Sequence, residues 1–286
     1  MKDRFQGFSP FMQLIVLILI GAVSFIILSM LVALITSSLY PSMPLDDIMI
    51  QQKNFPVQFM MMYYFPFQVG FLLIPGILFA LWSDSKLKLR KVNIKGISWS
   101  VLLFVSIFLL LPFFSEINIW FTESIGVFKE LEQQKIVSDA QMSELLGSTS
   151  DLSFWIGVLI IGVITGVSEE FAFRRLLFGH MLSYTKQLWV SLIGSAFIFA
   201  ILHFNYLQFL PLFTFGLALG MIYYFSVNIW TGVILHGLNN IINLWWLSTE
   251  SFPTWMENID PKTTIPSTLL LMGLLYYQFF RKRTTT

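Results

Sequence analysis

Two adjacent carboxylates and an arginine stand in a long apolar segment near the middle of the chain. Glu169 and Glu170 are followed by Arg174. Side chains four residues apart lie on one face of a helix, so Glu170 and Arg174 can form an ion pair, while Glu169 points elsewhere. A carboxylate without a neighbouring cation can take a proton from water. The segment therefore predicts Glu169 as a general base; the alternative is a charged cluster at the edge of the membrane.

Two later apolar segments carry imidazole and amide groups. His203 follows Phe199 by four residues in one segment, and His236 and Asn240 stand four apart in the other. That spacing places His236 and Asn240 on one helix face, where they can hold a water, a carbonyl oxygen or a developing oxyanion. The alternative for each group is a hydrogen bond that joins membrane helices.

An apolar helix normally excludes such groups, because an ionisable side chain at membrane depth costs at least ~2.5 kcal/mol. Together the three segments supply what peptide hydrolysis needs: a carboxylate to activate water, and imidazole and amide groups to stabilise the tetrahedral intermediate. The chain contains no cysteine, which excludes a thiol nucleophile. It also lacks a Gly-x-Ser-x-Gly motif near a histidine and any His-Glu-x-x-His motif.

The composition indicates that membrane helices position these groups. Apolar residues make up 56% of the chain and charged residues 12%, about half the charged fraction of a soluble domain. The predicted fold is an all-α, polytopic membrane helix bundle with about eight transmembrane helices. The apolar segments lie near 11–38, 57–82, 97–115, 153–177, 188–204, 207–225, 229–248 and 265–280.

The basic residues predict the orientation of this bundle, because lysine and arginine are enriched in cytoplasmic loops. With the N-terminus and the C-terminus both cytoplasmic, thirteen of the seventeen basic residues lie inside and twelve of the sixteen acidic residues lie outside. The outer segments keep only Lys53, Lys129, Lys135 and Lys262. We expect a multi-pass protein of the cell membrane, in a bacterial plasma membrane.

The chain is predicted to form a single membrane domain over residues 1–286, with the polar motifs in core helices at 150–248. Between spans, an outer loop at 116–151 contains a stretch, Phe128–Leu146, that mixes apolar and charged residues as a surface helix would. His180 is expected to be a solvated residue of an inner loop.

The order of the polar motifs resembles one known family. The pattern is Glu169-Glu170-x-x-x-Arg174, then Phe199-x-x-x-His203, then His236-x-x-x-Asn240. It is similar to the CAAX-protease and bacteriocin-processing (CPBP, or Abi) family of intramembrane endopeptidases. That family includes the type II CAAX prenyl endopeptidases and bacterial immunity proteins. The resemblance covers roughly residues 150–248.

The resemblance implies a role for each matching residue. Glu169 would activate the water, assisted by His203, and His236 with Asn240 would bind the oxyanion. The Glu170–Arg174 pair would support the site. The implied activity is that of a peptidase of the CAAX type, and the implied partners are a membrane-associated protein or peptide substrate and the lipid bilayer. No nucleic acid is expected to bind.

Two other functions fit the same motifs. One is a non-catalytic membrane immunity or binding protein of the same fold, which has no need to keep the complete set of polar groups. The other is a proton-coupled transporter, for which paired broken helices or an inverted repeat would be typical, and the sequence shows neither.

No cofactor is favoured, although zinc is possible. The family is often labelled a metalloprotease, and Glu169, His203 and His236 are acceptable zinc ligands in kind. We expect water activation without a metal, with this three-residue ligand set as the alternative.

Overall fold

The computed structural model describes residues 7–82, 94–226 and 228–252, together with 254, 265, 266, 268, 269 and 273. In this part of the chain the regular structure is helical throughout and no β-strand occurs, which confirms the predicted all-α class. Most of the eighth predicted span, 265–280, lies outside the described residues.

Five helical stretches of the described chain are long and apolar enough to cross a membrane. They are Pro10–Leu39, Pro56–Trp82, Gly96–Ser124, Leu152–Thr185 and Tyr206–Ser226, and they coincide with the first, second, third, fourth and sixth predicted spans. These helices support a multi-pass membrane protein, as the composition predicts. The fifth and seventh predicted spans correspond to α12 (Leu188–Ile201) and α14 (Ile229–Thr249); the total of eight stays a prediction.

The chain divides into two compact units, and each is described by itself. The first comprises Met1–Lys88, Ser138–Gln187 and His236–Ser251. The second comprises Leu89–Val137, Leu188–Leu235 and Phe252–Thr286.

The first unit begins with α2 (Pro10–Leu39). Ser9 caps this helix by accepting a hydrogen bond from the backbone N–H of Met12 at 3.3 Å, and Pro10 occupies its first turn, both favourable features at a helix N-terminus. The mean hydropathy of its most apolar window is 3.0, with 17% of that window buried within the protein. A helix that is apolar on all sides and mostly uncovered is suited to face lipid.

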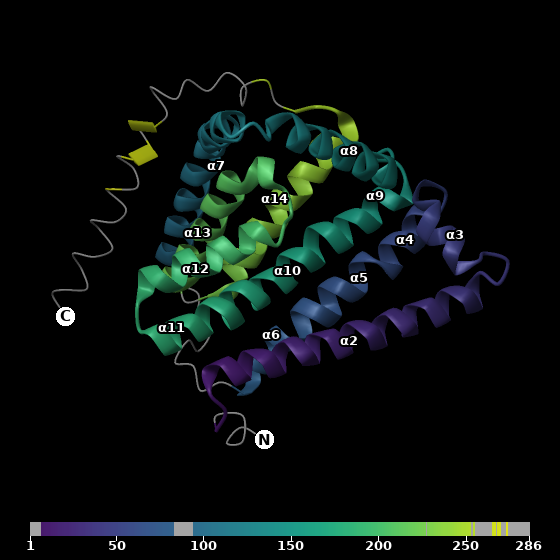
Figure 1. The fold of residues 1–286 in the computed structure, drawn as a ribbon, viewed down its shortest axis with the longest axis horizontal. Coiled ribbons are helices and arrows are strands. Elements are labelled where there is room, and N and C mark those ends of the chain that lie inside the picture. Colours follow the sequence, from purple (N-terminus) through teal and green to yellow (C-terminus); the bar gives the residue numbers. More distant parts are fainter. Residues whose placement is uncertain are drawn as a thin grey trace. The chain divides into compact units, whose positions relative to one another are not determined.

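The second helical stretch lies against α2 (Figure 1). Glycine allows the close approach, since a Cβ on Gly70 would lie 2.7 Å from Cα of Phe25. The segments from the first loop onward are α3 (Leu45–Ile50), η1 (Gln52–Asn54), α4 (Pro56–Met62), α5 (Tyr64–Pro66), the π-helical η2 (Phe67–Leu73) and α6 (Ile74–Trp82).

The fourth helical stretch alternates between α-helical and π-helical segments. In order these are α9 (Leu152–Gly157), the π-helical η3 (Val158–Ile164), α10 (Thr165–Glu169), the π-helical η4 (Glu170–Phe178) and α11 (Gly179–Thr185). Thr165 donates its hydroxyl to the carbonyl of Ile160, five residues back, at 3.1 Å. Segments of this kind occur often at functional sites, because the extra residue changes which side chains face a neighbour.

The second unit contains α7 (Ile94–Ser124), α12, η5 (Tyr206–Gln208) and α13 (Phe209–Ser226). Helix α7 runs nine residues beyond the predicted end at 115 and continues past Pro112. One cause is Asn118, which donates to the carbonyls of Tyr206 and Leu207 at 3.0 and 2.9 Å and accepts from the N–H of Leu210 at 3.0 Å. The loop predicted to start at 116 therefore starts after Ser124, and α8 (Phe128–Leu146) has the predicted bounds.

Candidate active site

The two adjacent carboxylates lie at the junction of α10 and η4, inside the first unit. The exposed fraction is 8% for Glu169, 0% for Glu170 and 2% for both Arg174 and His236. The predicted ion pair is present, with Nε of Arg174 3.3 Å from Oε2 of Glu170. The arginine also lies over the ring of Phe173, at 6.0 Å from its centroid. Burial makes this pair costly to break, because removal of one partner would leave the other charge buried and uncompensated.

His236 joins both carboxylates from α14. Its Nδ1 lies 3.0 Å from Oε1 of Glu170, and its Nε2 lies 3.7 Å from Oε2 of Glu169. An ionised carboxylate can only accept, so Nδ1 carries the proton of the shorter contact. The Nε2 atom then faces Glu169.

Glycine brings α14 close enough for these contacts. A Cβ on Gly162 would lie 2.7 Å from Cγ1 of Ile241, and a Cβ on Gly237 would lie 3.6 Å from the carbonyl oxygen of Gly162. Asn240, one turn after His236, donates from Nδ2 to the carbonyl of Ile161 at 3.3 Å. A second N–H of the same amide remains for another acceptor.

His203 belongs to the second unit, where it lies two residues beyond the end of α12. Its Nδ1 is 2.7 Å from the carbonyl oxygen of Phe199, and the two rings are 4.4 Å apart between centroids. Because a carbonyl accepts, Nδ1 donates and Nε2 is directed away from this bond. The four-residue spacing of Phe199 and His203 therefore fixes the orientation and tautomer of the imidazole.

The described residues offer part of a zinc site. Oε2 of Glu169 and Nε2 of His236 are 3.7 Å apart, a separation that two ligands of one zinc ion allow, and Glu170 on the other imidazole nitrogen is a typical outer partner of a zinc-bound histidine. A catalytic zinc site normally has three protein ligands. Over the residues that the structure describes, no group of three or more His, Cys, Asp and Glu side chains that could hold a metal ion occurs.

His180 differs from its prediction as a solvated loop residue. The fourth helical stretch continues to Thr185, so His180 lies in α11 with an exposed fraction of 8%. Its Nε2 is 2.9 Å from the carbonyl oxygen of Pro10, and its ring contacts the ring of Phe79. The imidazole thus links the start of α2 to the end of the fourth stretch.

Sequence reasoning also missed a polar pair beside Glu169. Ser168 donates its hydroxyl to Oε1 of Gln68 at 2.6 Å, and both residues are buried. The signal that could have found it is Gln68 itself, an amide in an otherwise apolar membrane segment.

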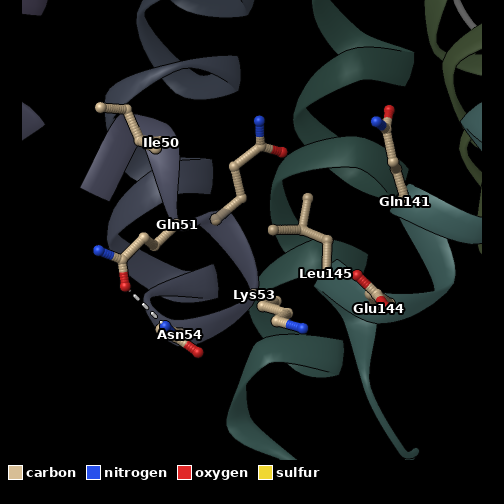
Figure 2. A pocket seen from close by; sticks show the side chains of 8 residues that line it. Ile50, Gln51, Lys53, Asn54, Gln141, Glu144 and Leu145 are labelled. Atoms are coloured by element: carbon tan, nitrogen blue, oxygen red, sulfur yellow. Dashed lines mark hydrogen bonds between the residues drawn. The ribbon is translucent and has the colours of Figure 1, made fainter. Parts of the chain in front are cut away.

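A separate pocket of about 450 Å³ lies between η1 and the C-terminal part of α8 (Figure 2). Its lining residues are Ile50, Gln51, Gln52, Lys53, Asn54, Gln141, Glu144 and Leu145. In it, Asn54 donates to Oε1 of Gln51 at 2.9 Å. None of the predicted site residues lines this pocket.

The buried cluster lies within a segment that matches a known protein family. Residues 151–242 match the family model described as type II CAAX prenyl endopeptidase Rce1-like. The match covers about one third of the chain and confirms the resemblance predicted from the motifs. All six predicted site residues fall in this Rce1-like segment. Its family is a protease family, which supports a peptidase. Neither the curated proteins nor the solved structures gave a match.

Proposed function

We propose that the protein is an intramembrane endopeptidase of the CAAX type, which hydrolyses a peptide bond of a membrane-associated protein or peptide. The observation that carries the proposal is the buried cluster of two carboxylates, an arginine and an imidazole inside the Rce1-like segment. A membrane helix keeps such groups where they perform chemistry.

In this mechanism Glu169 is the general base. The 3.7 Å between its Oε2 and Nε2 of His236 is too long for a direct hydrogen bond, and we place the attacking water beside both atoms. Glu169 takes a proton from that water while the water oxygen attacks the scissile carbonyl carbon. As the carbon–nitrogen bond breaks, the same proton passes to the leaving amine. His203 would assist in holding the water.

His236 lies against both carboxylates of the cluster, with Nδ1 facing Glu170 and Nε2 facing Glu169. During the attack Glu169 takes up the proton of the water and the substrate oxygen becomes negative, so the net charge of the site is unchanged. His236 and an N–H of Asn240 would then stabilise the oxyanion.

The proposed mechanism uses no metal. Zinc bound by Glu169, His203 and His236 is the alternative, and it would polarise the scissile carbonyl or lower the pKa of the bound water.

The test compares the membrane proteome of cells that produce the wild type with that of cells that produce Glu169→Gln. We expect at least one membrane-associated protein to be cut only in the wild type. Glu144→Gln, which changes an exposed glutamate of the separate pocket, is the matched control and should leave the cleavage unchanged. Identical proteomes for wild type and Glu169→Gln would contradict the proposed activity.

A further inference from the structure

The second helical stretch lies against the catalytic stretch on both sides of the two carboxylates. On one side, Ser168 donates to Gln68 at 2.6 Å. On the other, a Cβ on Gly76 would lie 2.8 Å from Cβ of Phe171 and 2.9 Å from its backbone carbonyl carbon. Ser168 and Phe171 flank the carboxylate pair in the chain, so these two contacts bracket it.

The hydrogen bond of this pair has a defined direction. The hydroxyl of Ser168 has one proton, and its two candidate acceptors are Oε1 of Gln68 at 2.6 Å and the carbonyl of Thr165 at 3.1 Å. The nearer acceptor gives the stronger bond. Exposed fractions of 0% for Ser168 and 7% for Gln68 mean that water does not compete for it, and breaking it would leave a buried polar group without a partner.

The helical context gives this bond a specific effect. Helix α10, which ends at Glu169, has only five residues and lies between the π-helical segments η3 and η4. The extra residue in each π-helical segment alters the facing of the side chains that follow. Regular α-helical hydrogen bonds to the neighbouring turns therefore do not determine how α10 is rotated about its axis. The hydrogen bond from Ser168 to Gln68 can determine it.

Gln68 is itself held in place from the opposite side. A Cβ on Gly70 would lie within 2.9 Å of backbone atoms of Ser24 and Phe25, and a Cβ on Gly21 would lie 2.8 Å from the carbonyl oxygen of Phe71. These backbone contacts fix η2 against α2, so the amide of Gln68 is presented from a packed support rather than from a mobile segment.

We propose that Gln68 is a positioning residue for the general base: through Ser168 it fixes the rotation of α10 that directs the carboxylate of Glu169 toward Nε2 of His236. The inference rests on the proposed function of Glu169. Gln68 acts through Ser168 and does not itself touch the scissile bond.

The first test measures cleavage of a fluorescence-quenched peptide that ends in a farnesylated cysteine, two aliphatic residues and a terminal residue, by full-length protein in lipid nanodiscs. Gln68→Met keeps the side-chain length and removes the acceptor, and Ser168→Ala removes the donor. We expect each to lower kcat about ten-fold with KM unchanged, because a small misplacement of a catalytic group costs rate rather than binding. The double variant should lose no more than the worse single variant.

The second test needs no substrate. Dicyclohexylcarbodiimide modifies protonated carboxyl groups in membranes, and mass spectrometry can follow its reaction at Glu169. We expect Gln68→Met to speed this modification several-fold, because a carboxylate turned out of the buried cluster is more accessible to the reagent. Ser153→Ala, which removes a buried hydroxyl bonded to the carbonyl of Leu146 at 2.7 Å, is the matched control and should change neither rate.

The outcomes separate the two proposals. Unchanged modification of Glu169 in Gln68→Met overturns the positioning role, whatever the activity. Faster modification together with no wild-type cleavage above that of Glu169→Gln supports the positioning role and counts against the proposed activity on this peptide. A loss of activity in Gln68→Met that a smaller folded fraction fully explains also overturns the positioning role.

Discussion

At the scale of single residues, Glu170 connects the two basic groups of the cluster. Its Oε2 faces Arg174 and its Oε1 accepts from Nδ1 of His236. One buried carboxylate therefore fixes both the guanidinium and the imidazole, and its position sets the tautomer of His236. Glu169 faces the other nitrogen of that imidazole, with its Oε2 3.7 Å from Nε2. We therefore propose different roles for the two adjacent glutamates: Glu170 orients its neighbours, and Glu169 reacts.

This difference predicts opposite outcomes for two similar substitutions. Glu169→Gln should lower turnover by ~10² or more while the protein stays folded. Glu170→Gln should destabilise the protein by about 3 kcal/mol, because it leaves Arg174 buried opposite a neutral amide. Peptide cleavage and thermal unfolding, measured on both purified variants, check this. Near-normal activity of Glu169→Gln, beside an inactive but equally stable Glu170→Gln, would reverse the assignment.

His236 and Asn240 should act as one unit. Each change to alanine should lower kcat by about 10²–10³ with KM nearly unchanged, since a lost oxyanion donor affects mainly the transition state. The double variant should lose less than the product of the two single losses. Metal analysis of the purified protein accompanies the kinetics. Stoichiometric zinc that disappears in His236→Ala and persists in Asn240→Ala would replace the oxyanion role with metal ligation.

The sequence predicts local contacts of the site better than distant ones. The pairing of Glu170 with Arg174 follows from a spacing of four residues within one helix. The contact between His236 and Glu170 spans 66 residues and depends on how α14 packs at Gly162, which no local rule specifies. The same is true of His180, whose partner Pro10 is 170 residues away.

At the scale of helices, polar groups of the site or their partners lie in each of the three π-helical segments. Segment η2 carries Gln68, η3 carries the carbonyl that Asn240 contacts, and η4 begins at Glu170. Apolar length and composition predict where a membrane helix runs, and five stretches confirm this. They do not predict a π-turn, because its extra residue is stabilised by packing between helices rather than by the local sequence.

Gly76 offers a test of the contact between helices. Gly76→Ala would place its Cβ 2.8 to 3.0 Å from Cβ and backbone atoms of Phe171, and backbone can yield only by moving η4. We expect Gly76→Ala to lower the free energy of unfolding by about 1–3 kcal/mol and to lower kcat. Gly96→Ala is the control, since a Cβ there meets no described atom within 4 Å. Equal melting temperatures and rates for the two variants would show that this contact does not hold the site.

At the scale of the whole molecule, the separation of charge along the chain carries more information than the net charge of +1. Outer segments of the predicted topology hold most of the acidic residues, and inner segments hold most of the basic ones. One span too many or too few would invert every segment that follows it and destroy this sorting. The orientation of the helices is tested by finding which side of the membrane each loop faces.

The absence of cysteine makes that test direct. Lys135→Cys, in α8, is expected outside, while Lys88→Cys and Arg283→Cys, at positions beyond the described residues, are expected in the cytoplasm because lysine and arginine favour that side. In intact cells an impermeant thiol reagent should label position 135 alone, and permeabilised cells should show labelling at all three. Full activity of each variant serves as the control for folding. Labelling of position 88 but not of position 135 in intact cells would invert the topology, and would place the carboxylate pair near the opposite face of the membrane.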